Sequence, residues 1–147
     1  TVPRSRRNPQ FNRETLPNDL KAFSITYTHI SGLGGLRRPR PDSSNTGWRN
    51  ASFRGFADYM QTSEFEKNLQ TLIELTGHER IALMCAEALP WRCHRSLISD
   101  ALLIRKIQAE HIMNEKHRHA HKLTPWAVVN GTSITYPPEL AQTGIDT

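Results

Sequence analysis

A chain of 147 residues is long enough to enclose one hydrophobic core, although its 37% of hydrophobic residues and its mean hydropathy of −0.58 are both low. No apolar run approaches the roughly 20 residues that a membrane-spanning helix needs, and two cysteines are too few for the disulfide scaffold of a small secreted domain. These bulk properties argue against membrane insertion and secretion, and they predict one cytoplasmic domain over residues 1–147.

Arginine supplies most of the positive charge. The chain has 14 Arg, 5 Lys and a formal net charge of +5, and nine of the arginines lie between residues 4 and 54. A guanidinium group grips a phosphate or a carboxylate in two places. We therefore expect an anion-binding surface whose partner is a phosphate-bearing small molecule or a nucleic acid; a solvated basic face is the alternative. The candidate anion-binding residues are Arg4, Arg6, Arg37, Arg54 and Arg92.

The first third of the chain is expected to be largely irregular. Residues 1–15 are polar and aperiodic, which indicates an extended segment. A short helix is expected over residues 16–23, with Pro17 in its first turn, and the β-forming residues 25–30 predict a strand. Residues 37–50 follow as a polar loop that contains two prolines. This loop is longer than most connections in compact domains, so we expect it to be functional or mobile.

The rest of the chain alternates between helical and extended patterns. Apolar spacing and capping signals predict helices over residues 53–60, 63–76, 94–105 and 126–129. Strands are expected at 81–85, an apolar run typical of a buried strand, and at 111–113, followed by an irregular tail over 132–147. The pattern predicts an α/β domain with a mostly parallel sheet flanked by helices. Because few strands are evident and no methionine or first βα unit opens the chain, we also expect a missing N-terminal portion.

The segment from Cys85 to Arg95, Cys-Ala-Glu-Ala-Leu-Pro-Trp-Arg-Cys-His-Arg, joins the expected strand 81–85 to the following helix. In α/β proteins the loop between the end of a buried strand and a helix N-terminus usually binds anions and carries chemistry. Neighbouring arginines, a histidine and a helix dipole favour a cysteine in its thiolate form. The candidate catalytic residues are Cys85, Glu87, Cys93, His94 and Arg95.

The chemistry of this segment leaves several assignments open. Either cysteine can be the nucleophile, Glu87 or His94 the general acid or base, and Arg95 the group that holds a phosphate or an oxyanion. The structural alternatives are a Cys85 buried in the core and an Arg95–Glu87 ion pair.

Two further interpretations concern metals and redox chemistry. The seven residues between the cysteines do not match the knuckle of a structural zinc site, and a Cys85–Cys93 disulfide is a further alternative. The histidines at 117, 119 and 121 are typical of a solvated segment, with metal chelation as the alternative. The sequence assigns no metal, no particular cofactor and no oligomeric state.

Several motifs occur in a recognisable order: Pro3-Arg4-Ser5-Arg6, Leu33-Gly34-Gly35-Leu36-Arg37, Phe53-Arg54-Gly55-Phe56, Cys85-x-Glu87-x-x-Pro90-x-x-Cys93-His94-Arg95, His121-Lys122-Leu123-Thr124 and Thr135-Tyr136-Pro137. Together they closely resemble the family called domain of unknown function 488. The resemblance covers nearly the whole chain. It implies an α/β fold that begins with a strand, a helix and a second strand, and a cytoplasmic location. It implies no particular reaction.

Two functions from different classes are compatible with the sequence. The first is an enzyme that acts on a phosphate-bearing substrate, a nucleotide or a nucleic acid, through the loop from Cys85 to Arg95. The second is a non-catalytic, arginine-rich nucleic-acid-binding module in which that loop is structural. Single-strand binders often place aromatic residues among their basic ones, and the arginine clusters here contain none, which favours the enzyme.

Overall fold

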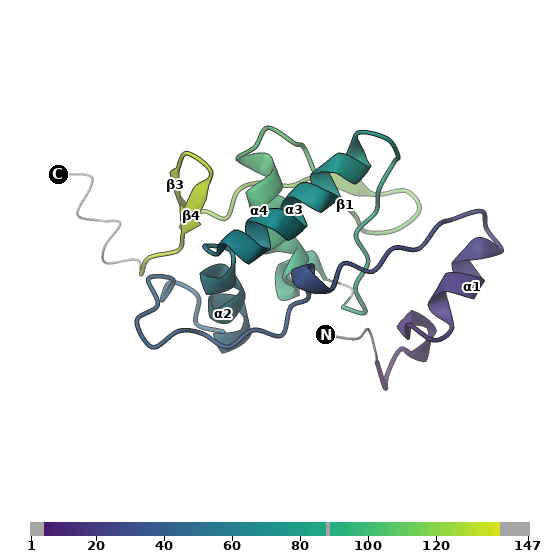
Figure 1. Ribbon diagram of the computed structural model, residues 1–147, viewed down its shortest axis with the longest axis horizontal. Helices are drawn as coiled ribbons and strands as arrows, with labels where there is room; N and C mark the ends of the chain where they lie inside the picture. The colour runs from purple at the N-terminus through teal and green to yellow at the C-terminus, as the bar shows by residue number, and fades with distance from the viewer. Residues whose placement is uncertain (1–4, 88, 139–147) are drawn as a thin grey trace.

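The computed structural model describes residues 5–87 and 89–138. Figure 1 shows the elements in chain order. The α-helices are α1 (Leu16–Lys21), α2 (Ala51–Tyr59), α3 (Ser63–Thr76) and α4 (Arg95–Leu103). The strands are β1 (Glu110–Ile112), β2 (Arg118–Ala120), β3 (Val128–Asn130) and β4 (Ser133–Thr135). Three short 3-10 helices, η1 (Pro9–Phe11), η2 (Ser31–Leu33) and η3 (Pro90–Arg92), lie in the connections.

The prediction of a mostly parallel sheet flanked by helices is wrong. In the described residues the strands form two separate antiparallel hairpins, β1 with β2 and β3 with β4. Residues 25–30 and 81–85, which were expected to be strands, belong to neither hairpin. Apart from Ile25, which donates to Leu20, their backbone N–H groups donate to no described backbone carbonyl. Their composition favours an extended backbone, but a sheet also requires a neighbouring strand to pair with.

The helix expected over residues 126–129 is also wrong, because β3 begins at Val128. Gly131, with φ of +64°, opens the turn that leads into β4. A two-residue hairpin turn of this kind needs a positive φ, which glycine adopts at little cost. The other expected helices are present, and the short strand expected at residues 111–113 is β1, shifted by one residue.

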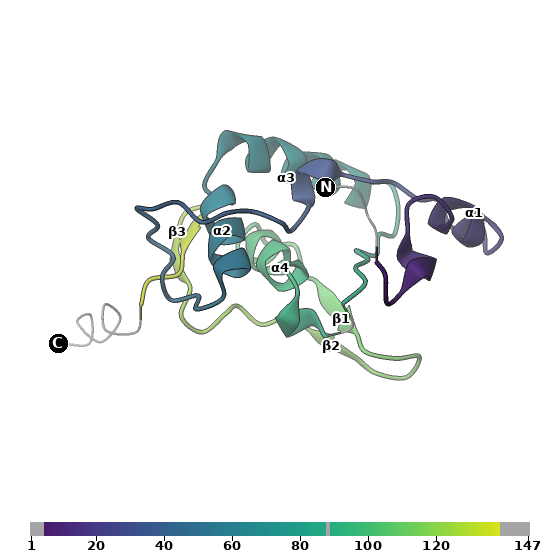
Figure 2. The same cartoon turned by 90° about the horizontal axis from the view of Figure 1, so that it is seen from below.

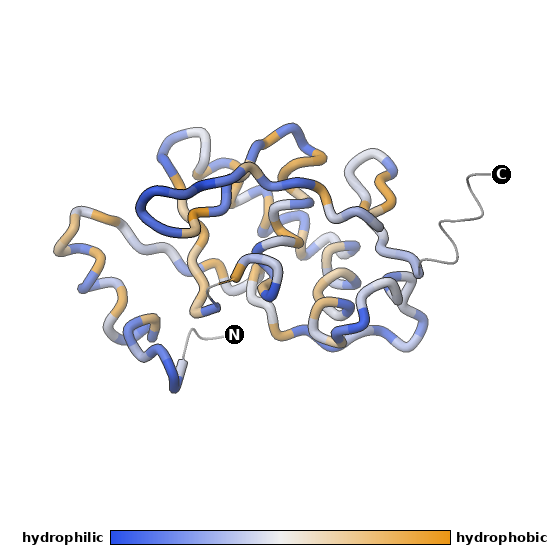
Figure 3. Tube along the Cα trace, turned by 180° about the vertical axis from the view of Figure 1, so that it is seen from behind, coloured by the Kyte–Doolittle hydropathy of each residue, from blue (hydrophilic) through white to orange (hydrophobic). Residues whose placement is uncertain are grey.

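The hydrophobic core lies between α2, α3 and α4 and is closed by the segment that includes β4. The most buried of its large side chains are Phe56, Phe65, Leu69, Leu97 and Tyr136. Phe56 meets Phe65 edge to face, with ring centroids 6.0 Å apart. Along the chain hydrophobic and hydrophilic residues alternate, as Figure 3 shows. The buried residues of α3, Phe65, Leu69 and Leu72, recur every three or four positions and form its inward face. Figures 1 and 2 show α1 at one end of the molecule and β3 and β4 toward the other. None of the described helices combines the length and apolarity needed to cross a bilayer.

A buried carboxylate on α4 anchors the C-terminal part of the chain. Asp100 is fully buried and accepts hydrogen bonds from His121 Nε2 at 2.6 Å and from Tyr136 Oη at 2.8 Å. Its two oxygens also accept the backbone N–H and the hydroxyl of Thr124, at 3.1 and 2.6 Å. Burial and the nearby Asp100 charge raise the pKa of Tyr136, so its hydroxyl remains a donor. The expectation of a solvated histidine segment is therefore wrong for His121.

A second buried carboxylate, Asp58 on α2, holds the polar loop of residues 37–50. It accepts the backbone N–H of Arg40 at 2.8 Å, the Ser43 hydroxyl at 2.6 Å and the Asn45 amide at 2.7 Å. Asn45 in turn accepts the backbone N–H of Tyr136 at 2.9 Å. These bonds order a loop that contains no helix or strand.

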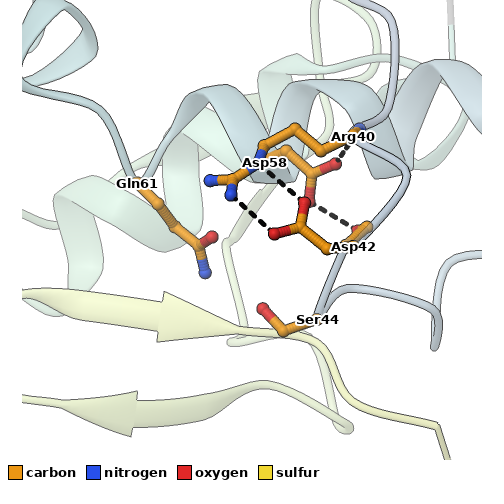
Figure 4. A pocket seen from close by; sticks show the side chains of 6 residues that line it. Arg40, Asp42, Ser44, Asp58 and Gln61 are labelled. Atoms are coloured by element: carbon orange, nitrogen blue, oxygen red, sulfur yellow. Dashed lines mark hydrogen bonds and ion pairs between the residues drawn. The ribbon is translucent and has the colours of Figure 1, made fainter.

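The loop encloses a polar hollow of about 250 Å³ next to Asp58, drawn in Figure 4. Its lining residues are Arg40, Asp42, Ser43, Ser44, Asp58 and Gln61. Inside it, Arg40 pairs with Asp42 at 2.9 Å, and Asp58 is fully engaged with the loop. The hollow is therefore part of the architecture that holds the loop.

Replacing Asp100 by Asn tests the anchor on α4. The amide NH₂ group presents a donor where the network supplies only donors, so we expect the free energy of unfolding to fall by roughly 3 kcal/mol, measured by urea denaturation. Asp42→Asn is the matched control, because Asp42 lies on the surface, and its midpoint should stay within error of the parent chain. Equal midpoints for the two variants would show that Asp100 does not anchor the fold.

Candidate active site

The segment from Cys85 to Arg95 folds as a loop, the 3-10 helix η3 and the start of α4. Pro90 opens η3 and is buried, and its fixed φ suits the first position of a helical turn. The carbonyl of Pro90 accepts the backbone N–H of Cys93 at 3.1 Å, which ends the turn. Cys93 then adopts an extended backbone just before α4 begins at Arg95. The local sequence therefore places one sulfur at a helix N-terminus.

The sulfur of Cys93 is surrounded by hydrogen-bond donors. Arg95 donates to it twice, from its backbone N–H at 3.4 Å and from Nε at 3.2 Å. Cys85 shares a hydrogen bond with it, and Nδ1 of His94 lies 3.7 Å away. The hydrogen bond from Cys85 and then the contacts with Arg95 outweigh burial and lower the pKa of Cys93 to about 6. Cys93 is therefore a thiolate at neutral pH.

The pKa of the second cysteine, Cys85, is shifted in the opposite direction. Cys85 is half-buried, and its hydrogen bond to Cys93, followed by burial, raises its pKa far above that of an ordinary thiol. The pair shares one proton, and the two contacts from Arg95 favour the Cys93 sulfur as the one that loses it. Cys85 is not sealed in the hydrophobic core, which removes the structural alternative for that residue.

Arg95 also fixes the preceding loop. Its Nη2 donates to the backbone carbonyl of Glu87, so one guanidinium links the loop to the Cys93 sulfur. The Glu87 carboxylate accepts the backbone N–H of Leu89 at 3.3 Å and is exposed. The contact between Arg95 and Glu87 is therefore to the main chain and differs from the carboxylate ion pair considered from the sequence.

His94 is held in a tight environment. Its ring packs on Phe56, with centroids 5.1 Å apart, and hydrogen-bonds the backbone of Leu33. Burial, together with the positive charges of Arg95 and Arg37, lowers its pKa, so the imidazole is neutral. On the other side of the ring a Cβ at Gly35 would come within 2.5 Å of Nδ1. Only glycine permits this approach.

Four of the five candidate catalytic residues share one hollow. Cys85, Glu87, Cys93 and His94 line a cavity of about 250 Å³, and Arg92 lines it with them. Arg95 contacts the Cys93 sulfur but is not a lining residue. The remaining lining residues are Gly35, Leu36, Ser52 and Phe53. The sequence did not single out these four residues as part of the site. The adjacent glycines Gly34 and Gly35 are the signal that could have done so, because glycine allows the backbone to approach a neighbouring group closely.

The arginines of the first third do not gather at this hollow in the described part of the chain. Arg37 stacks on Tyr59, 3.7 Å from the ring centroid, and donates to two backbone carbonyls near η2. Arg54 donates to the carbonyl of Trp48 at 3.2 Å. Arg6 is exposed, and Arg4 lies outside the described residues. Arg92 is thus the member of the expected anion-binding set that the structure places in the hollow.

These features define a small domain of helices and hairpins with a thiolate site at the N-terminus of a helix. The chain belongs to the family described as Domain of unknown function DUF488, whose model matches residues 1–102. The match includes the segment from Cys85 to Arg95, and it confirms the family named from the motifs. Neither the curated proteins nor the solved structures contain a match to this chain. Among residues 5–87 and 89–138, no group of three or more His, Cys, Asp or Glu side chains is arranged to hold a metal ion.

The ionisation of Cys93 can be tested by alkylation with iodoacetamide. Only the thiolate reacts, so the rate should rise with pH through a midpoint of about 6. Arg95→Gln should move this midpoint upward because it removes the guanidinium that contacts the sulfur. Arg92→Gln is the matched control and should leave it nearly unchanged. A midpoint at the ordinary thiol value of roughly 8.5 in the parent chain would contradict a stabilised thiolate.

Proposed function

We propose that this protein is an enzyme that uses the Cys93 thiolate as a nucleophile on a phosphate-bearing substrate, a nucleotide or a nucleic acid end. The observation that carries the proposal is the meeting of a stabilised thiolate with Arg92, Glu87 and a neutral His94 in one hollow. A nucleophile, an anion-binding cation and groups able to move protons are the parts that such a reaction needs.

The first step forms a bond between Cys93 Sγ and phosphorus and breaks the bond from phosphorus to the leaving oxygen. Arg92 binds the negative oxygens of the phosphoryl group, and the exposed Glu87 relays a proton from solvent to the leaving oxygen. Arg95 acts on Cys93 from outside the hollow, so it is a positioning residue that keeps the sulfur ionised.

The second step returns the enzyme to its starting state. A water molecule gives a proton to the neutral imidazole of His94 and attacks phosphorus, which releases phosphate and the Cys93 thiolate. His94 then passes this proton to solvent. A lowered pKa suits His94 to accept a proton at neutral pH only transiently. The hollow of about 250 Å³ is slightly smaller than a typical ligand pocket of roughly 300–1,000 Å³, so only the phosphate-bearing end of a substrate enters it.

The arginine-rich binding module is the less supported function. Arg37 and Arg54 are engaged with an aromatic ring and with backbone carbonyls, which reduces the charge that they can offer to a polyanion. Any contribution of Arg4 and Arg6 to nucleic-acid binding is measured in the binding test below.

The proposal is tested by release of the leaving group from phosphate monoesters, phosphodiesters and nucleotides. We expect turnover by the parent chain and a loss of at least about 10³-fold in kcat for Cys93→Ser. Arg92→Gln should raise KM more than it lowers kcat, whereas Arg118→Gln, an exposed arginine on β2, should change neither. Inorganic phosphate and vanadate should also slow alkylation of Cys93.

Two results together would contradict the proposed enzymatic function. They are no turnover of any of these substrates and a rate of Cys93 alkylation that phosphate and vanadate leave unchanged. Nucleic-acid binding that falls linearly with salt on a log–log plot and survives Cys93→Ser would favour the binding module instead.

A further inference from the structure

We propose that the same site carries out a second reaction, the two-electron reduction of a hydroperoxide, in which Cys93 and Cys85 are oxidised to a disulfide. The proposal rests on the Cys93 thiolate of the proposed function, but it needs no phosphate in the hollow. Both cysteines are free, and both line the same cavity. A small oxidant in the hollow therefore meets both sulfurs.

The environment of Cys93 indicates that its sulfur reacts first. Hydroperoxides are attacked by thiolates, and the two contacts from Arg95 hold Cys93 in that form. In the first step the Cys93 sulfur bonds to one peroxide oxygen while the O–O bond breaks. The other oxygen takes a proton from solvent and leaves as an alcohol or as water, and Cys93 becomes a sulfenic acid.

Cys85 is placed to complete the reaction. Once ionised, its sulfur attacks the sulfur of the sulfenic acid, the S–S bond forms, the S–O bond breaks, and the hydroxyl leaves as water with the proton that Cys85 has given up. Overall, the two cysteines together lose two electrons in forming the disulfide, and one hydroperoxide is reduced to an alcohol and water.

Oxidation of Cys93 also prepares Cys85 for the second step. The Cys93 thiolate is the main cause of the raised pKa of Cys85, so oxidation of Cys93 removes that cause. Cys85 is then free to ionise and attack. Cys85 also ends a segment, residues 81–85, whose backbone N–H groups donate to no described backbone carbonyl, so its movement toward Cys93 breaks no sheet.

The test treats the reduced full chain with a stoichiometric amount of hydrogen peroxide and analyses it by mass spectrometry. Trypsin cuts after Arg80, Arg92 and Arg95, which leaves Cys85 on peptide 81–92 and Cys93 on peptide 93–95. We expect these peptides to be joined, with a mass two hydrogens below their sum, and to separate after dithiothreitol.

Two cysteine variants distinguish the roles of the sulfurs. Cys85→Ser should stop at a sulfenic acid on Cys93 that dimedone traps, and Cys93→Ser should react at least about tenfold more slowly than the parent chain. Circular dichroism checks that both variants fold. The proposal is overturned if the parent chain keeps two alkylatable cysteines after peroxide, if Cys93→Ser reacts as fast as the parent, or if the disulfides join two molecules.

Repeating the reaction with inorganic phosphate present separates this proposal from the proposed function. If the disulfide forms and phosphate has no effect on its rate, the redox reaction stands and phosphate binding in the hollow is not supported. If phosphate slows the reaction, both proposals gain support. If phosphate esters turn over while no disulfide forms, only the redox reaction is removed.

Discussion

The hydrogen bonds from Arg95 to the sulfur of Cys93 are the interaction on which the candidate site depends. A buried anion is stable only when donors replace the water that it has lost, and Arg95 supplies two of them to Cys93. The same side chain holds the carbonyl of Glu87, so the charge that stabilises the thiolate also shapes the loop around it. Without this contact the Cys93 sulfur would lose two of the donors that favour its thiolate.

Helix α4 joins this site to the rest of the fold. Arg95 stands at its N-terminus, and Asp100, further along the same helix, receives the hydrogen bonds that bind the C-terminal part of the chain. The neighbouring His94 contacts both Phe56 of α2 and the backbone near Gly35. Packed helices therefore hold the part of the site around Cys93 and His94, whereas Cys85 and Glu87 lie on the preceding loop.

Local patterns were sufficient for α2, α3 and α4, although not for residues 126–129, and they singled out the segment that forms the candidate site. The apolar spacing of α2, α3 and α4 is a property of each segment alone, and the density of titratable residues between Cys85 and Arg95 marked the loop without any knowledge of the fold. The parallel sheet failed because residues 25–30 and 81–85 favour extension, while pairing depends on distant segments. The charges of Arg37 and Arg54 were visible, but their carbonyl and ring partners were not. Asp58 and Asp100 carry no local signature, since only tertiary packing makes them buried acceptors.

The position of the shared proton at neutral pH is the most direct test of this account. Carbon-13 NMR of a chain labelled at the cysteine Cβ atoms reports thiol and thiolate separately, and Cys85→Ser and Cys93→Ser assign the two signals. The account predicts a thiolate shift for Cys93 and a thiol shift for Cys85. Two thiol shifts, or a thiolate at Cys85 instead, would contradict it.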